Sequence, residues 1–216
     1  VAHALFGSVC EKVLGVAPHV MVENGREFVP LVLRFVWHRV WAGGDRVVGR
    51  SEVGLGAAVA ALPGGDGWED GPGGSDQRRL PTLLAMLAKI KGPSQLPHGA
   101  VLRRIYTFYL CHPSHAVSSP ALACLTAYGA PHLVPHAETL AGILSKSLRD
   151  ALAKFNPEKA VAAEHRAGLM PLLARILFGR LLSTASGGRK NNGGIAARRT
   201  AVTIFLGVHF RADELE

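Results

Sequence analysis

The sequence predicts an all-α fold, a HEAT/armadillo-like α-solenoid built from stacked helical pairs. Apolar residues recur at helical spacing from about Phe28 to Leu182. Prolines and glycines separate these stretches at short intervals, as they do in the turns between packed helices. Hydrophobic residues make up 48% of the chain but aromatic residues only 6%, so the core is expected to consist mainly of Leu, Val and Ala. Such a core suits packed helices better than a β-sandwich.

Three helices are expected before residue 110. The first covers residues 28–40, where apolar side chains fall on one face and a pair of glycines follows the last turn. The second covers residues 80–90 and has a proline at its second position, which the first turn of a helix tolerates. The third covers residues 101–109 and ends before a Cys-His-Pro sequence.

Three shorter helices follow, each bounded by turn residues. Residues 121–128 form the first, which is closed by a glycine and a proline. Residues 136–144 form the second. Residues 148–155 form the third, and an Asn-Pro pair ends it.

The longest expected helix runs over residues 162–182. Its leucines and isoleucine share one face, arginines lie on the other, and Pro171 is the single interruption. The last apolar stretch, residues 201–208, is rich in β-branched residues and by itself could be a strand. We interpret it as a short helix, in keeping with the rest of the chain.

Two glycine-rich segments are expected to be flexible. Residues 63–76 contain many glycines and two prolines, which indicates an insertion between helical repeats over 1–62 and 77–216. Residues 186–196 are polar and glycine-rich, and they are expected to form a flexible basic loop inside the second group of repeats.

The positive charge of the chain is concentrated in one region. The net charge is +8, and the stretch from Lys146 to Arg199 holds eleven Lys and Arg against three acids, whereas the rest of the chain holds thirteen of each. A concentrated positive field is expected of a surface that faces a polyanion. A solvated helical face with a charged loop is the alternative. The candidate phosphate contacts are Arg189, Lys190, Arg198 and Arg199.

The sequence contains no motif that indicates a metal site, a cofactor site or a catalytic centre. The three cysteines lie far apart and form no CxxC pair, which favours a reducing compartment over a disulfide framework or a zinc site. His132 and His136 have the spacing of two ligands on one helix, but prolines beside them favour a turn. No apolar run is long enough to span a bilayer. The chain begins with Val1 and has no closing feature, so we expect a fragment of a longer protein.

The stretch from Glu164 to Arg180, EHRAGLMPLLARILFGR, is the most distinctive motif in the chain. It resembles the core signature of the small nucleolar RNA-associated, down-regulated-in-metastasis family of the small-subunit processome. In that signature His-Arg opens a helix that ends in Arg-Ile-Leu-Tyr-Gly-Arg, and Phe178 here stands in place of the tyrosine. A glycine-rich insertion, an Arg-bearing helix and an acidic exit at Asp213-Glu214 follow in the family's order. The Ser118-Ser119-Pro120 sequence departs from the family, which has a smooth helix start there.

The resemblance implies a very long solenoid that wraps pre-ribosomal particles and is needed to process small-subunit ribosomal RNA. It implies a non-catalytic scaffold without a cofactor, located in the nucleolus of the nucleus. Its implied partners are pre-ribosomal RNA, processome proteins and a small nucleolar ribonucleoprotein, with no membrane and no small-molecule substrate. The rival interpretation is a protein-binding HEAT-repeat adaptor, similar to a transport receptor, without RNA contact.

The polar and small residues of the signature are expected to have structural roles. Arg166 could bond the carbonyls of a neighbouring turn and so tie two repeats together, although a role as a ligand for a partner is also open. Arg175 and Arg180 could line a groove or form solvated edges. The signature residues singled out are His165, Arg166, Arg175, Gly179 and Arg180.

Overall fold

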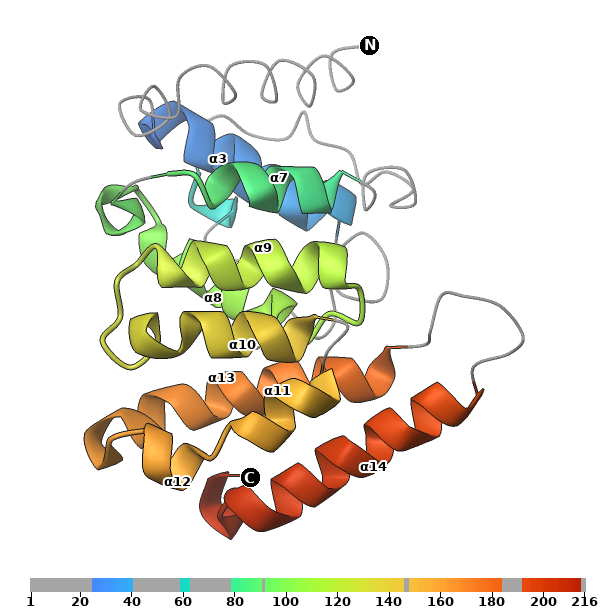
Figure 1. Cartoon of the computed structure of the whole chain (residues 1–216). Coiled ribbons are helices and arrows are strands. Elements are labelled where there is room, and N and C mark those ends of the chain that lie inside the picture. Colours follow the sequence, from blue (N-terminus) through green and yellow to red (C-terminus); the bar gives the residue numbers. More distant parts are fainter. Residues whose placement is uncertain are drawn as a thin grey trace. The chain divides into compact units, whose positions relative to one another are not determined.

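The computed structural model describes residues 25–40, 59–62, 79–90, 92–145, 148–183 and 192–214. Every regular element within these ranges is a helix, which confirms the all-α prediction (Figure 1). The chain divides into two compact units. The first contains Val1–Phe108 and Ala123–Tyr128, and the second contains Tyr109–Leu122 and Gly129–Glu216.

The helices of the first unit bury aliphatic side chains, as their sequence periodicity predicts. Leu33, Leu84 and Leu102 are almost completely buried. Cys124 also lies in this core, where its Sγ donates to the carbonyl oxygen of Leu84 at 3.3 Å, and burial raises the pKa of the thiol. The elements of this unit include α3 (Gly25–Phe35), the π-helical turn η1 (Val36–Val40), α7 (Leu80–Leu87), η2 (Pro93–Gln95) and α8 (Gly99–Tyr109). Only the last residue of α8, Tyr109, belongs to the second unit.

The second unit is a succession of packed helices. Helix α10 contacts α11 and α13, and α14 contacts both α11 and α13. Its elements are η3 (Val134–His136), α10 (Ala137–Leu144), α11 (Leu148–Lys154), α12 (Pro157–Ala160), α13 (Ala163–Leu182), α14 (Asn192–His209) and η4 (Ala212–Glu214). Helix α9 (His115–Thr126) belongs to this unit up to Leu122 and to the first unit from Ala123.

Helix α13 confirms the longest predicted helix almost residue for residue. Leu169, Leu173, Ile176 and Leu177 are fully buried on one face, as their spacing predicts. Pro171 lies inside the helix without ending it. Pro171 is exposed, whereas neighbouring residues of the helix are buried. The packing of these buried side chains compensates for the one backbone hydrogen bond that a proline removes, so the helix continues.

Helix α9 begins earlier than predicted. It starts at His115 rather than at residue 121, so the Ser118-Ser119-Pro120 sequence lies inside a helix and does not interrupt one. Ser118 is buried, and its hydroxyl donates to the carbonyl oxygen of Ser114 at 3.3 Å. A serine whose hydroxyl bonds the preceding turn is compatible with a helix, which sequence rules alone do not reveal.

Helix α14 is also longer than predicted. It begins at Asn192 rather than at residue 201, so the expected loop over 186–196 ends no later than residue 191. Arg198 and Arg199 consequently lie inside the helix and not at its start. The burial of Val202 and Phe205 anchors this helix, and tertiary packing of this kind overrides the low helix propensity of β-branched residues.

Helix α12 occupies a position where only a helix end was predicted. The Asn156-Pro157 pair does end α11, but it also starts α12. The side-chain oxygen of Asn156 accepts from the backbone N–H of Glu158 at 3.0 Å, and Pro157 takes the first helical position. The same two residues therefore serve as a stop and as a cap.

The predicted insertion over residues 63–76 lies outside the described residues, as do residues 186–191 of the basic loop. The division of the chain at the insertion and the flexibility of both segments therefore stay predictions.

The helix phase of α13 can be tested with two aspartate substitutions on the same helix. Leu173 is fully buried, so Leu173→Asp is expected to unfold the second unit, because an unpaired buried charge costs at least several kcal/mol against a stability of roughly 5–15 kcal/mol. Phe178 is 55% exposed, so Phe178→Asp is expected to melt like the parent. Thermal melts followed by circular dichroism compare the two, and equal melting temperatures would show that the helix phase is wrong.

Candidate functional site

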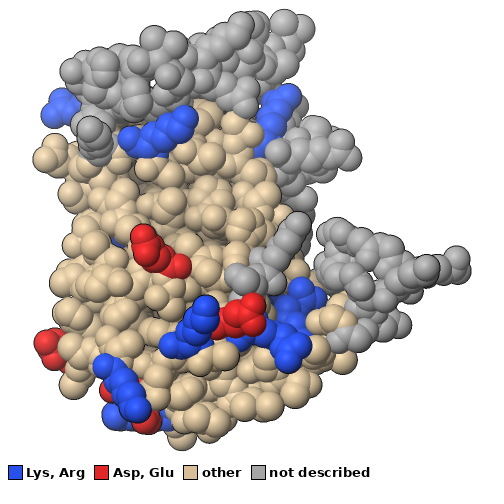
Figure 2. All heavy atoms as spheres, viewed as in Figure 1, with Lys and Arg blue, Asp and Glu red and all other residues tan. Residues whose placement is uncertain are grey.

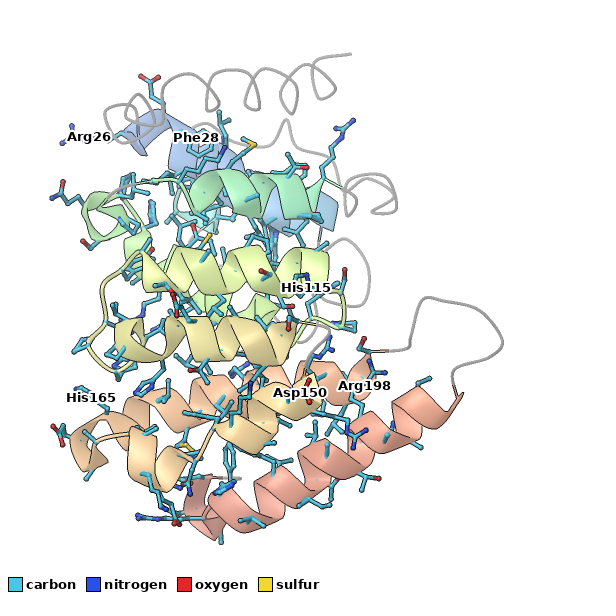
Figure 3. The ribbon with its side chains drawn as sticks, in the orientation of Figure 1. Arg26, Phe28, His115, Asp150, His165 and Arg198 are labelled. Atoms are coloured by element: carbon cyan, nitrogen blue, oxygen red, sulfur yellow. The ribbon has the colours of Figure 1, made fainter. Side chains whose placement is uncertain are left out.

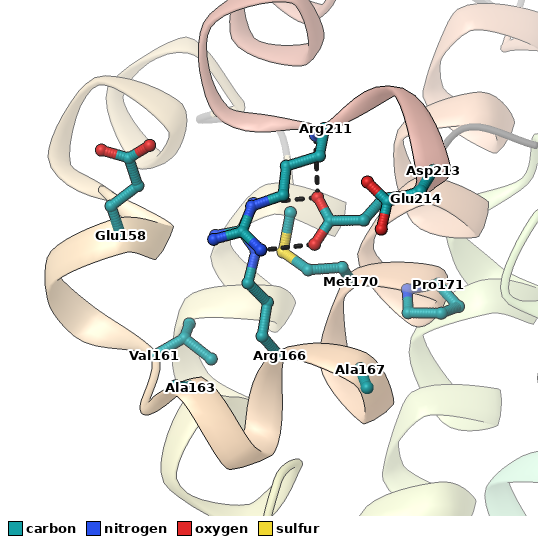
Figure 4. Close-up of a pocket in the computed structure, with 10 residues that line it drawn as sticks. All are labelled: Glu158, Val161, Ala163, Arg166, Ala167, Met170, Pro171, Arg211, Asp213 and Glu214. Atoms are coloured by element: carbon teal, nitrogen blue, oxygen red, sulfur yellow. Dashed lines mark hydrogen bonds and ion pairs between the residues drawn. The ribbon is translucent and has the colours of Figure 1, made fainter.

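Arg166 in the first turns of α13 joins this helix to the end of the described chain. Its Nε donates to Oε1 of Glu214 at 2.6 Å, and its Nη2 donates to Oε2 of Glu214 at 2.8 Å (Figure 4). The same Nη2 also donates to the backbone carbonyl oxygen of His209, the last residue of α14, at 2.7 Å. One guanidinium thus holds both the carboxylate of η4 and a backbone carbonyl at a helix end.

The ion pair is mostly shielded from water. The side chains of Arg166 and Glu214 are 10% and 12% exposed. The hydrogen bonds from Arg166 hold the pKa of Glu214 below its ordinary value, although burial opposes this shift. The backbone N–H of Arg211 adds a further bond to Oε2 of Glu214 at 2.9 Å. Each oxygen of the carboxylate therefore has a donor, which is the condition under which a buried ion pair is favourable.

A cavity of about 730 Å³ lies beside this ion pair (Figure 4). Both apolar and charged side chains line this cavity. The charged ones include Glu158 and Asp213 as well as Arg166 and Glu214. The remaining lining residues are Val161, Ala163, Ala167, Met170, Pro171 and Arg211. The hydrogen bond to Glu214 is the main cause that raises the pKa of Arg166. The negative charges of Glu158 and Asp213 raise it further, while burial opposes the rise.

Two glycines of α13 allow close packing against neighbouring backbone and side chains. A Cβ on Gly179 would lie 2.6 Å from the carbonyl oxygen of Cys111. A Cβ on Gly168 would lie 2.8 Å from the ring of His132. Gly179 is therefore required by the approach of another chain segment. The structural role that the sequence predicts for Gly179 stays a prediction, which this close approach supports.

The histidines around α13 lie in turns and helix ends. His132 is in a turn and His136 is in the 3-10 helix η3, so the two do not share a face of one α-helix. Burial lowers the pKa of His136, and His165 nearby adds to this effect. His165 itself is half-buried at the start of α13 (Figure 3).

Arg180 and Arg198 are brought together by α13 and α14. Nη2 of Arg180 donates to the carbonyl oxygen of Ser145 at 3.1 Å, and Nη2 of Arg198 donates to that of Ser183 at 2.6 Å. Nε of each arginine is buried and has no hydrogen-bond partner among the described residues. Burial lowers the pKa of Arg180, and the charge of Arg198 lowers it further.

The other predicted basic residues are placed differently. Arg199 is exposed, and Arg175 is half-buried on α13. Arg189 and Lys190 lie outside the described residues. The phosphate contacts expected of Arg189, Lys190, Arg198 and Arg199 therefore stay a prediction.

Residues 75–216 match the family described as U3 small nucleolar RNA-associated protein 20, N-terminal. The chain belongs to this family. A relative of the same name from Schizosaccharomyces pombe is 27% identical over 139 residues, which cover 62% of this chain and 5% of that protein. The chain therefore spans a small part of the length of the curated relative that it matches.

The region matched to the U3 small nucleolar RNA-associated protein 20 family contains every site residue named above. In the described part of the chain, no three His, Cys, Asp or Glu side chains gather closely enough to hold a metal ion. Among the described residues, no helix is long and apolar enough to cross a membrane.

The sequence did not reveal the partner of Arg166. The acidic exit at Asp213-Glu214 was recognised as part of the family pattern, but its link to Arg166 spans 48 residues and depends on how α14 packs. No local spacing rule reaches that far. The structural interpretation of Arg166 did include bonds to the carbonyls of a neighbouring turn, and the bond to His209 is of this kind.

The Arg166–Glu214 pair predicts a pH-dependent loss of stability. The folded state lowers the pKa of Glu214. The ion pair therefore contributes its full stabilisation of the fold above the ordinary glutamate pKa of about 4.3. This stabilisation is lost as the pH falls from there through the lowered pKa of the folded state. Glu214→Gln is expected to cost about 2 kcal/mol of unfolding free energy at pH 7. Urea unfolding at pH 7 and pH 3.5 measures both proteins, and the difference between them should shrink at the lower pH. A constant difference would mean that the charge of Glu214 does not stabilise the fold.

The packing of Gly179 predicts opposite effects of two glycine-to-alanine changes. Gly179→Ala would place a methyl group against the Cys111 backbone, so a loss of about 1–3 kcal/mol is expected. Gly207 in α14 has no atom within 4 Å of its added Cβ, so Gly207→Ala is expected to stabilise by about 0.5–1 kcal/mol. Chemical denaturation compares the two variants, and the same sign for both would contradict the close approach at Gly179.

Proposed function

We propose that the chain is a non-catalytic scaffold section of a small-subunit processome component, needed for small-subunit ribosomal RNA processing in the nucleolus. The observation that carries this proposal is the family match over residues 75–216, which includes the signature helix α13. Three residues of that helix support a structural role, because all of them contact other parts of the same unit. Arg166 binds the carboxylate of Glu214, Arg180 binds the carbonyl of Ser145, and Gly179 lies close to the backbone of Cys111.

The partners proposed for this section are pre-ribosomal RNA, processome proteins and a small nucleolar ribonucleoprotein. The relative's printed name, which associates it with a small nucleolar RNA, supports this choice. The charge distribution supports RNA contact, since the stretch from Lys146 to Arg199 carries the whole net charge of +8. Arg149, Lys154, Lys159 and Arg199 in this stretch are exposed. On the face that Figure 2 shows, basic side chains gather over α11 to α14, with acidic ones between them.

A protein-binding adaptor without RNA contact is the second candidate. Exposed apolar side chains support it, because Phe178 and Leu182 on α13 are more than half exposed, as are Ile204 and Val208 on α14. Exposed apolar residues that recur on one side of a helix are typical of protein contacts. Single exposed apolar residues are also common on ordinary surfaces, so this observation carries less weight than the charge distribution.

The salt dependence of RNA binding separates these two functions. In a titration of the purified chain with a structured ribosomal RNA fragment, affinity is expected to fall steeply with salt, because each neutralised phosphate releases counterions. Changing Arg189, Lys190 and Arg199 to Gln should flatten the slope of log affinity against log salt by up to about three contacts.

The matched control changes three exposed arginines outside the basic region, Arg26, Arg103 and Arg104, to Gln. This control should leave the slope unchanged. Absence of RNA binding by the parent, or equal slopes for the two triple variants, would refute RNA contact through the basic region and favour the protein-binding adaptor.

A further inference from the structure

Arg180 and Arg198 form a fixed pair of half-buried cations. Nη2 of Arg180 donates to the carbonyl oxygen of Ser145, and Nη2 of Arg198 donates to that of Ser183. These bonds restrain both guanidinium groups in position. Ser183 lies only one turn beyond Arg180, so the bond from α14 to Ser183 brings the second guanidinium to the same end of α13. The arrangement therefore comes from backbone contacts within the second unit and needs no partner to form.

No carboxylate in the described ranges neutralises either charge of this pair. No described acid forms an ion pair with Arg180 or Arg198. Asp150 lies on α11, which packs against α14, but it makes no ion pair with Arg198 (Figure 3). Arg166 on the same helix shows the contrast, because Glu214 neutralises it with two hydrogen bonds. Two adjacent half-buried cations repel each other, and an anion would offset this cost.

The two guanidinium groups still have donors that an anion can reach. Each Nε is buried and lies below the surface. Nη1 of each arginine makes no hydrogen bond to a described residue, and it is not among the buried atoms that lack a partner. The charge of Arg198 acts on Arg180, so the two restrained guanidinium groups are neighbours and can offer their remaining donors to the oxygens of one phosphate group.

We propose that Arg180 and Arg198 together clamp a single phosphate group of an RNA backbone. This clamp rests on the proposed function, and it adds Arg180 to the predicted contacts. It also separates Arg198 from Arg199, because Arg199 is exposed and no hydrogen bond to a described residue restrains it. A contact of this kind positions the protein on RNA without reading its sequence.

The test uses the whole 216-residue chain with two probes, inorganic phosphate and the ribosomal RNA fragment. The variants are Arg180→Gln, Arg198→Gln and the double variant, since glutamine keeps an N–H donor for the carbonyl. A matched double variant, Arg149→Gln with Arg199→Gln, removes two exposed charges from the same region. Thermal melts establish that all variants are folded.

Because both arginines hold one phosphate, each single variant should weaken RNA binding, and the double variant should lower the salt slope by about one contact rather than two. The matched double variant should lower the slope by up to about two contacts. Arginine Nε–Hε resonances of the parent should shift with inorganic phosphate at Arg180 and Arg198 but not at Arg199. Asp150→Asn should strengthen phosphate binding, because it removes the acid on the adjacent helix.

The outcomes separate the clamp from the proposed function. If the parent binds RNA and the Arg180/Arg198 double variant binds it equally well, the clamp is wrong while the RNA contact stands. If inorganic phosphate shifts both arginines but RNA binding ignores them, the pair is a site for small anions and the RNA clamp is overturned. If the parent binds no RNA, the RNA contact of the proposed function fails and the clamp fails with it.

Discussion

The bidentate pair between Arg166 and Glu214 is the interaction on which the second unit depends most. It joins the start of α13 to η4, and through the His209 carbonyl it also holds the end of α14. Helix α14 contacts α11 and α13, so its position depends on this anchor at one end. In the first half of α14, Arg198 binds the carbonyl of Ser183, which follows the last residue of α13. Two arginines therefore hold α14 in two places, and among the described carboxylates only Glu214 neutralises one of them, Arg166.

The fold could be predicted well from the sequence because its helices obey local rules. The buried face of α13, including Leu169, Leu173 and Ile176, follows the 3.6-residue period closely. Errors occurred where packing outweighed local preference. At Pro120 and near residues 192–200, turn-forming or flexible residues continue into helices that buried neighbours hold in place.

The candidate site was predictable only in part. The signature residues Arg166, Gly179 and Arg180 were identified from the sequence, and the structure gives each a definite contact. Their partners could not be identified, because Glu214 and Ser145 lie 48 and 35 residues away along the chain. Such contacts are decided by how helices stack, and a single sequence carries no record of that stacking.

The two candidate functions use different side chains of the same two helices. Phe178 and Ile204 present apolar surface, while Arg180 and Arg198 carry charges that no described carboxylate neutralises. Apolar surface is buried by a protein partner with little dependence on salt, whereas cations contact phosphates with a strong dependence on it. The scaffold proposed above would use both kinds of contact. Because α13 and α14 carry both, loss of one kind need not remove the other, and salt is the variable that distinguishes them.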